Sequence, residues 1–304
     1  MTADASGGPV IVIHAGAGAQ SEELTEHESA CREALVKALR AGRRALDDGL
    51  DASRAAERAV MVLEDFELFN AGRGSTLCSD GTVEMSAALM RGSDRAAGAV
   101  AGMRHSQNPI LGARALLDSP QVFMSGPAAD ERAALGGVRQ RPATYFVTKR
   151  QQASLSEYLA DQGNGPNPGG AGRATVGAVC LDGAGMLAAA TSTGGIRGQP
   201  PGRVGDCPVI GAGTWADDRA AVSCTGDGEA FIRCATARQV ADLVDRGESL
   251  AAAVEGALGQ IASLQAAGGL IALDRDGNVA MPFITPVMPR GLWRPGGPPE
   301  TWVG

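Results

Sequence analysis

The pattern of hydrophobic and polar positions in the first third of the chain predicts one strand and two helices. Residues 10–13 form a β-branched run that ends in a glycine-rich turn, as a buried strand does. Thr25 and Glu28 have the spacing of a capping box, so a helix should begin there. A second amphipathic helix is expected over about residues 52–65. The two should pack closely on one face of a sheet through small buried residues, namely Cys31, Leu35, Ala38, Gly42 and Ala45, and Ala55, Ala56, Ala59, Val60 and Leu63.

The apolar runs in the rest of the chain are short and separated by turns. A hairpin is expected where strand-like residues 175–181 and 186–193 flank the turn Asp182-Gly183. The order of elements favours antiparallel sheets between helix layers, in the α+β class. The other expected strands lie at 83–90, 96–103, 122–124, 220–224, 269–273 and 279–281, and the other helices at 109–117, 229–244 and 250–264.

One segment in the middle of the chain fits neither helix nor strand. Residues 163–172 consist almost entirely of glycine, proline, asparagine and alanine. We therefore expect a flexible, exposed linker over about residues 149–174.

Composition narrows the class of protein. The chain has 304 residues, of which 44% are hydrophobic and 20% charged, as in a soluble globular protein with a sizeable core. A net charge of −7 without a basic cluster argues against binding to nucleic acid or to an anionic membrane. No signal peptide and no apolar run of membrane-spanning length is evident, so a cytoplasmic protein is expected.

Cysteine and histidine usage narrows the chemistry further. The six cysteines form no CxxC pair and are expected to be small buried hydrophobes in a reducing compartment. The three histidines, His14, His27 and His105, give little support to a Ser-His-Asp or zinc hydrolase. No organic cofactor is expected.

Thr175 is the most informative residue, because it follows the linker directly and begins an apolar strand. Cleavage of the Ala174–Thr175 bond would give Thr175 a free α-amine beside its hydroxyl. An α-amine with a pKa of roughly 7.7–8.0 can take the hydroxyl proton, so nucleophile and base would come from one residue. Taken alone, Thr175 could equally be an ordinary first residue of a strand.

Motifs along nearly the whole chain resemble the plant-type (type III) asparaginases, also called isoaspartyl peptidases, which are N-terminal-nucleophile hydrolases. The second half carries TVGAV at 175–179, ATSTGG at 190–195, GRVGD at 202–206, GAG at 211–213 and SCTGDGE at 223–229. The first half carries IH at 13–14, LFNAG at 68–72, AGAVAG at 97–102 and NP at 108–109, and the closing strands GGLIAL at 268–273 and MPF at 281–283.

The resemblance implies an αββα sandwich that cleaves itself before Thr175 into residues 1–174 and 175–304. It further implies a homodimer of the cleaved units and hydrolysis of L-asparagine or isoaspartyl dipeptides through an acyl-Thr175 intermediate. In this interpretation Thr193 supports the nucleophile, Thr225 and the Gly226 N–H line an oxyanion hole, and Asn70 reaches the same region.

The resemblance also assigns residues that hold the substrate. Arg203 would bind the α-carboxylate of an L-aspartyl substrate and Asp206 its α-ammonium, whereas outside the motif the same pair could be a surface salt bridge. Gly226 and Gly228 would let backbone groups approach the ligand. A structural sodium ion could be held by main-chain carbonyls, which leave almost no side-chain signature; these belong to Leu63, Glu64, Phe66, Phe69, Ala71 and Arg73.

Four positions depart from the family pattern. Ala15 stands where the family has a glycine, and Ala174 where a glycine or aspartate precedes the nucleophile, so self-cleavage is expected to be slow. Ser86 replaces an aspartate and Ile284 an asparagine. Two alternatives therefore stay open, a glycosylasparaginase-like amidase or threonine protease of the same superfamily, and an uncleaved relative that only binds an amino acid.

Overall fold

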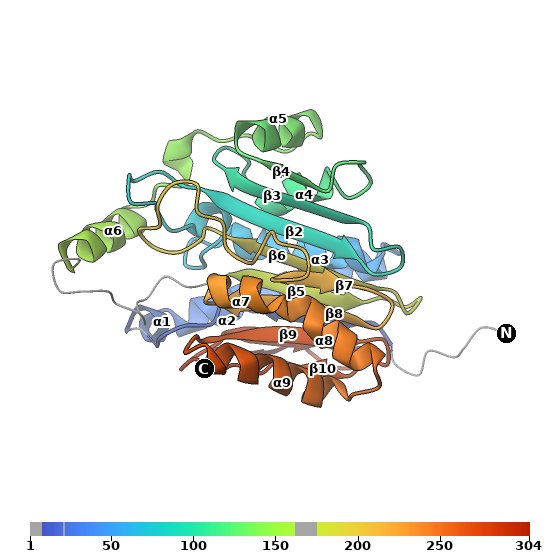
Figure 1. Ribbon diagram of the computed structural model, residues 1–304. Helices are drawn as coiled ribbons and strands as arrows, with labels where there is room; N and C mark the ends of the chain where they lie inside the picture. The colour runs from blue at the N-terminus through green and yellow to red at the C-terminus, as the bar shows by residue number, and fades with distance from the viewer. Residues whose placement is uncertain (1–7, 21, 162–174) are drawn as a thin grey trace.

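Two β-sheets form the centre of the molecule in the computed structural model, which describes residues 8–20, 22–161 and 175–304 (Figure 1). Neighbouring strands are antiparallel except β3 and β4, which are parallel. The larger sheet has the order β12 (Glu300–Trp302), β11 (Arg290–Trp293), β1 (Val10–His14), β5 (Val176–Leu181), β6 (Leu187–Thr193), β2 (Met85–Arg91), β3 (Ala97–Met103) and β4 (Phe123–Ser125). The smaller sheet has the order β10 (Val279–Ala280), β9 (Gly268–Asp274), β8 (Ala220–Gly226) and β7 (Thr214–Ala216).

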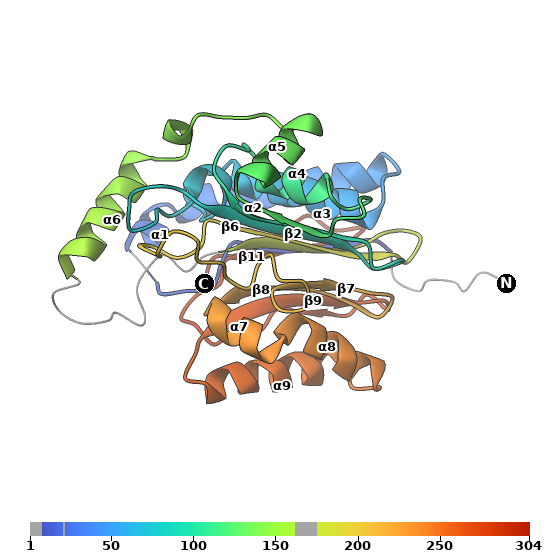
Figure 2. The same ribbon diagram turned by 45° about the horizontal axis from the view of Figure 1, so that its top comes forward.

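Helices cover the outer faces of both sheets (Figure 2). Over the larger sheet lie α2 (Glu28–Asp47), α3 (Ala52–Glu64) and α4 (Pro109–Arg114); over the smaller sheet lie α7 (Gly228–Cys234), α8 (Thr236–Asp245) and α9 (Leu250–Ser263). The remaining helices are α1 (Glu22–Glu26), α5 (Pro127–Leu135) and α6 (Lys149–Asp161), with short 3-10 turns at Gly72–Gly74 and Ala143–Tyr145. The expected mixture of antiparallel sheets and helix layers, in the α+β class, is confirmed.

Alternate residues of the central strands face different hydrophobic layers. In β1, Ile11 and Ile13 pack against the helices, whereas Val10 and Val12 pack between the two sheets. A third apolar layer joins the smaller sheet to α8 and α9. Because both faces of β1 are covered, this strand is a continuous apolar run rather than an alternating one. The expected buried faces of α2 and α3 are confirmed residue by residue.

The capping box expected at Thr25 is wrong. Thr25 lies inside the short helix α1, and His27 is the residue that precedes α2. Glu28, which would have completed the box, instead accepts a hydrogen bond of 2.8 Å from Arg32 one turn later. Glu28 therefore forms an ordinary i, i+4 ion pair on the helix surface and does not reach back toward Thr25.

The linker was expected to begin at residue 149, and this start is wrong. Residues 149–161 form helix α6, whose lysine, arginine, glutamine, leucine and alanine residues are good helix formers. Tertiary contacts fix this helix, since Leu155 is buried and the Gln151 side chain donates 2.7 Å to the Gly74 carbonyl. Residues 162–174 lie outside the described residues, so the linker prediction is untested there.

The single helix expected over 229–244 is two helices. Ala235 has a left-handed backbone with φ 49°, and the chain turns between α7 and α8. The backbone N–H groups of Ala237 and Arg238 donate to the carbonyls of Ala212 and Gly211, at 3.1 and 2.8 Å. These loop carbonyls accept N–H groups in the first turn of α8, which have no partner within the helix. Contacts of this kind cannot be read from the periodicity of apolar residues.

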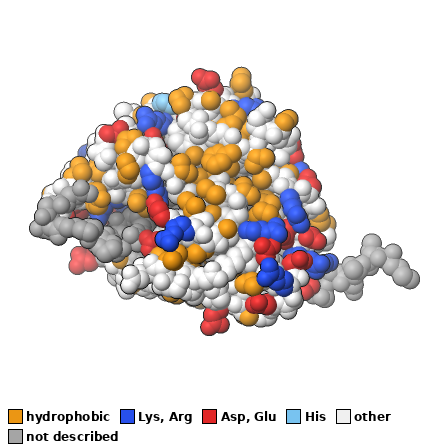
Figure 3. Space-filling model, viewed as in Figure 1, with side chains coloured by type: hydrophobic (Ala, Val, Ile, Leu, Met, Phe, Trp, Pro, Cys, Tyr) orange, Lys and Arg blue, Asp and Glu red, His pale blue; other side chains and the backbone are white. Residues whose placement is uncertain are grey.

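The surface carries both charges interspersed with scattered hydrophobic side chains on the face seen in Figure 3. No helix within the described residues is both long and apolar enough to cross a membrane. All six cysteines are described, and all are free thiols, of which only Cys234 is not buried. Their expected role as small buried hydrophobes is confirmed for the other five.

Replacing Ala235 with glycine should raise the free energy of unfolding by about 0.5–1 kcal/mol, because glycine adopts positive φ without steric cost. Urea denaturation of the purified protein measures the change. Ala41→Gly in the middle of α2 is the matched control and should lower stability by up to about 1 kcal/mol. Equal destabilisation by both substitutions would contradict the strain assigned to Ala235.

Candidate active site

Strand pairing brings Thr175 and Thr193 together. In the antiparallel register of β5 and β6, Val176 lies opposite Ser192, so the next pair outward is Thr175 and Thr193. Their hydroxyl oxygens are 3.2 Å apart, with Thr175 Oγ1 donating to Thr193 Oγ1. Thr193 Oγ1 also accepts the Gly195 N–H at 3.0 Å, and both side chains are buried. The predicted nucleophile and its predicted supporting threonine are thus in direct contact.

The second sheet supplies Thr225 and Gly226. Strand β8 packs against β5 and β6, and Thr225 at its end is fully buried. The Thr225 hydroxyl oxygen accepts the Ala17 N–H at 3.2 Å, which leaves its own proton free to donate elsewhere. Gly226 has φ 143°, and a Cβ there would lie 2.5 Å from the Ala267 carbonyl oxygen. Only glycine can therefore present its backbone at this point.

Asn70 organises the turn that follows Thr193. Its Nδ2 donates to the Gly195 carbonyl at 2.6 Å, and its own backbone carbonyl accepts the Gly194 N–H at 3.0 Å. The Asn70 Oδ1 accepts the Thr76 N–H at 2.8 Å. The structure therefore brings Asn70 to the region predicted for it, through the backbone on which Thr193 is mounted.

Arg203 and Asp206 lie on either side of Gly228. A Cβ at Gly228 would be 2.8 Å from Asp206 Oδ1 and 3.1 Å from Arg203 Nη2, so a side chain there would fill the space between the two charges. Arg203 forms a two-pronged ion pair with Glu229, with both N–O distances 2.9 Å. The Arg203 side chain is 12% exposed and that of Glu229 is 63% exposed. Glu229 is therefore a surface carboxylate that occupies the guanidinium fork.

Asp206 is a buried carboxylate that lacks a complete set of partners. Its Oδ2 atom has no hydrogen-bond partner in the described part of the chain. Burial raises the pKa of Asp206 to about 7, although the nearby Arg203 acts in the opposite direction. A buried carboxylate oxygen without a donor is unfavourable, so this position is suited to a cationic group of a ligand.

A chain of buried polar side chains joins the two sheets beside Thr175, and the sequence patterns did not indicate it. His14 Nε2 is 3.0 Å from Ser223 Oγ, which is 2.8 Å from Thr191 Oγ1. Thr214 Oγ1 donates to Thr191 Oγ1 at 2.6 Å and lies 3.0 Å from the Cys207 carbonyl, next to Asp206. These residues are inward-facing positions of four strands in both sheets. His14, Thr191 and Ser223 lie within the family motifs, but the motifs did not indicate that they form one chain with Thr214.

Gly177 makes room for this chain. A Cβ at Gly177, which lies opposite His14 in the β1–β5 register, would collide with both the His14 ring and the Ser223 hydroxyl. Burial lowers the pKa of His14 to about 3, against a smaller raising effect from a backbone hydrogen bond with Thr175. His14 is therefore neutral at physiological pH, and one ring nitrogen can donate while the other accepts.

The side chain of Glu64 is a further buried polar group whose contacts the sequence patterns did not indicate. Glu64 Oε1 accepts the Ser192 hydroxyl at 2.6 Å and the Ile110 N–H at 2.9 Å. Burial raises the pKa of Glu64 to about 8, with these hydrogen bonds acting against the shift. Because Ser192 precedes Thr193, Glu64 ties helices α3 and α4 to the strand that carries the supporting threonine.

The loop expected to bind sodium is closely packed around Gly72. Gly72 has φ 53°, and a Cβ there would lie 2.5 Å from the Glu64 carbonyl oxygen. Four of the six predicted ligand carbonyls, those of Leu63, Phe66, Phe69 and Ala71, also accept backbone hydrogen bonds within the loop. A carbonyl oxygen that accepts one hydrogen bond keeps a second lone pair, so these bonds leave the six carbonyls chemically able to bind a hard cation. No cluster of three or more acidic, cysteine or histidine side chains that could bind a metal occurs among the described residues.

The four departures have different surroundings. Ala15 does not adopt positive φ, and the neighbouring Gly16 does, at φ 104°. Ser86 is buried and pairs with Thr193 in the β2–β6 register, whereas Ile284 is 42% exposed. Ala174 lies outside the described residues.

Comparisons with known proteins show which family this chain is similar to over nearly its whole length. A model of the asparaginase family matches residues 7–302. The isoaspartyl peptidase of Escherichia coli is 42% identical over 98% of this chain and 96% of its own length. An isoaspartyl peptidase/L-asparaginase of Bos taurus is 38% identical over 92% of each chain. A probable isoaspartyl peptidase/L-asparaginase of Arabidopsis thaliana is 37% identical over 94% of this chain and 95% of its own.

The buried neutral His14 should make stability depend on pH. The unfolded chain binds a proton on His14 near its ordinary pKa of 6.5, whereas the folded chain resists until about pH 3. Stability from this residue is therefore lost as pH falls below about 6.5, by up to about 1.4 kcal/mol per pH unit. In urea denaturation between pH 7.5 and 4.5, His14→Gln should lose less stability on acidification than the wild type. Parallel losses in the two proteins would contradict this.

Proposed function

Because this chain belongs to the asparaginase family, we propose that it is an amidohydrolase of L-asparagine and β-aspartyl (isoaspartyl) dipeptides, with Thr175 as nucleophile. The observation that carries the proposal is the 3.2 Å contact between the Thr175 and Thr193 hydroxyls at the end of a strand pair. The unpartnered Asp206 oxygen beside Arg203 supports an aspartyl substrate. We further assign the layers of Figure 2 to the αββα sandwich of N-terminal-nucleophile hydrolases.

Maturation would break the Ala174–Thr175 bond and give residues 1–174 and 175–304. The Thr175 hydroxyl would then attack the side-chain amide carbon, and its proton would pass to the new α-amine. The amine leaves with a proton returned from the α-ammonium, and an ester of Thr175 remains. Attack by water on this ester, with the α-amine again accepting a proton, releases aspartate and restores the hydroxyl.

The second sheet would stabilise charge during both attacks. The Thr225 hydroxyl already accepts the Ala17 N–H, so its own proton is available for an oxyanion. The Gly226 N–H would be the second donor. Donors fixed by strand packing need no reorganisation as the charge develops, which is the main source of catalysis at such sites.

Substrate recognition would rest on Arg203 and Asp206. The substrate α-carboxylate would replace the exposed Glu229 on the Arg203 guanidinium, since both offer two oxygens to the same fork. The substrate α-ammonium would donate to the unpartnered Asp206 oxygen. Gly228 keeps the space between them open.

Three further features are part of the proposal. The carbonyls of Leu63, Glu64, Phe66, Phe69, Ala71 and Arg73 would hold a sodium ion that rigidifies the loop leading to Asn70. The cleaved αβ units would form a homodimer, and the enzyme would work in the cytoplasm without an organic cofactor.

Purified protein should separate into two polypeptides, the smaller beginning at Thr175, and should release aspartate from asparagine and from β-Asp-Leu. Mass spectrometry and N-terminal sequencing identify the fragments. Thr175→Ala should stay intact, because it lacks the attacking hydroxyl, whereas Thr175→Ser should still be cleaved. An intact wild-type chain that releases no aspartate would refute the proposal, and preference for a glycosylated asparagine would favour a glycosylasparaginase.

Asp206→Asn should lower kcat/KM for asparagine by about 100-fold, because a charge partner is lost from a buried ion pair. The same change should raise stability, since the pKa of Asp206 is raised to about 7 and the fold favours its protonated form. In the wild type, the stability that the protonated Asp206 contributes is fully present below the ordinary pKa of 3.8 and is lost as pH rises to about 7. The asparagine side chain stays neutral, so the gain at pH 8 is on the order of 4 kcal/mol.

Thermal and urea unfolding at pH 5 and pH 8 check the sign of this effect. Asp182→Asn is the matched control, because Asp182 is also buried but accepts the N–H groups of Ala52, Ala184 and Met186. That variant should be less stable than the wild type and retain activity. A less stable Asp206→Asn protein at pH 8 would contradict the prediction.

A further inference from the structure

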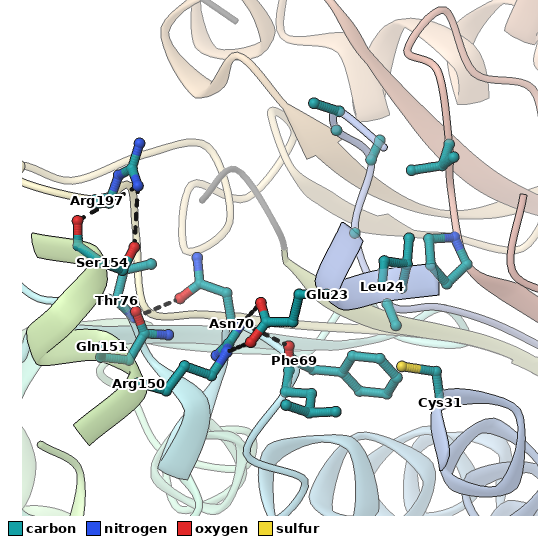
Figure 4. A pocket seen from close by; sticks show the side chains of 18 of the residues that line it. Glu23, Leu24, Cys31, Phe69, Asn70, Thr76, Arg150, Gln151, Ser154 and Arg197 are labelled. Carbon is teal, nitrogen blue, oxygen red and sulfur yellow. Dashed lines mark hydrogen bonds and ion pairs between the residues drawn. The ribbon is translucent and has the colours of Figure 1, made fainter. Parts of the chain in front are cut away.

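A pocket of about 440 Å³ lies beside the proposed catalytic group, and no step above uses it. Figure 4 shows Arg197 and Ser154 at one end of the pocket, and Leu24, Phe69 and Cys31 at the other. A pocket of this size accommodates a small organic ligand, with polar groups fixing its orientation and apolar walls excluding water. It is therefore a candidate binding site.

Two residues of the pocket wall touch the catalytic threonines or their support. Ala17 donates its N–H to Thr225 Oγ1, and Asn70 donates to the Gly195 carbonyl, whose own N–H reaches Thr193 Oγ1. The pocket and the catalytic group therefore share a wall.

The chain that follows β1 brings the pocket wall to the end of β5 at which Thr175 lies. His14 pairs with Gly177, two residues from Thr175, in the last pair of the β1–β5 register, and residues 15–19, which follow directly, line the pocket. In the proposed reaction the leaving amine takes its proton from the α-ammonium of Thr175. The pocket lies at the end of β5 where this proton transfer would take place, so it is placed to receive the leaving group.

Among the described residues, Arg197 is the cation of the pocket wall that has no acidic partner. The other arginine in the wall, Arg150, is paired with Glu23 and also donates to the carbonyls of Glu67 and Leu68. Arg197 Nη1 donates only to Ser154, at 3.1 Å to its hydroxyl, and Arg197 Nε is buried without a partner in the described residues. A buried guanidinium N–H without an acceptor is unfavourable and indicates a place for an anion.

Stacking holds this guanidinium in place. Its carbon lies 5.4 Å from the centre of the Tyr158 ring on helix α6, which also presents Ser154. Tyr158 further fills the space against Gly198, next in sequence to Arg197. A cation fixed by an aromatic ring and a hydroxyl is preorganised to receive a carboxylate.

We propose that this pocket binds the leaving amino acid of isoaspartyl dipeptides, with its α-carboxylate on Arg197 and an apolar side chain toward Leu24 and Phe69. The inference rests on the proposed function, because it requires hydrolysis at Thr175. It makes Arg197 a specificity-determining residue that matters for dipeptides and is idle with asparagine, whose leaving group is ammonia.

The test compares Arg197→Met with the wild type on asparagine, β-Asp-Leu and β-Asp-leucinamide. The variant should raise KM for β-Asp-Leu by about tenfold, because a charge-assisted hydrogen bond is lost. Asparagine and the amide, which both lack the leaving-group carboxylate, should change by less than about twofold. Arg40→Met, which removes an exposed arginine on α2, is the matched control and should leave all three substrates unaffected.

Each outcome separates this inference from the proposed function. A wild-type enzyme that hydrolyses all three substrates, with an Arg197→Met effect that is absent or equal for all of them, would overturn the inference alone. A wild-type chain that hydrolyses none of them would refute the proposed function itself.

Discussion

The antiparallel register of β5 and β6 is the constraint on which the site depends. It sets Thr175 opposite Thr193 at the end of a buried strand pair, where both hydroxyls are shielded from bulk water. A shift by one residue would turn either threonine to the other face of the sheet, because side chains alternate along a strand. The apolar layers on both sides of the larger sheet hold this register, since slippage would expose or bury the wrong residues.

The two sheets must also be held at a fixed offset, because Thr225 and Gly226 belong to the smaller one. Apolar packing between sheets is not directional, and it tolerates small slides. The His14–Ser223–Thr191–Thr214 chain crosses this layer with directional hydrogen bonds near the end where Thr175 lies. Gly177 leaves room for this chain between the sheets, so strand β5, which begins directly after Thr175, is shaped around it.

Several of the same groups are unfavourable for folding. The buried carboxyls of Asp206 and Glu64 both have raised pKa values, and Asp206 has an oxygen without a donor. Such groups persist where a ligand or a precise geometry requires them, and the large apolar layers offset their cost. The Arg197 guanidinium is a further example, because its buried Nε has no hydrogen-bond partner among the described residues and would gain one from a bound ligand.

The sequence by itself determined the α+β class, most strands and the buried faces of α2 and α3, and its resemblance to the asparaginase family predicted Thr175, Thr193, Thr225, Arg203 and Asp206 as site residues. Periodicity and motifs are properties of short stretches of sequence, so they can be recognised without knowledge of the tertiary structure. Tertiary structure alone decided that 149–161 is a helix, that the helix over 229–244 breaks at Ala235, and that Arg203 pairs with Glu229. It also decided the polar chain from His14 and the place of Arg197. Each of these depends on atoms distant in sequence, which no local pattern encodes.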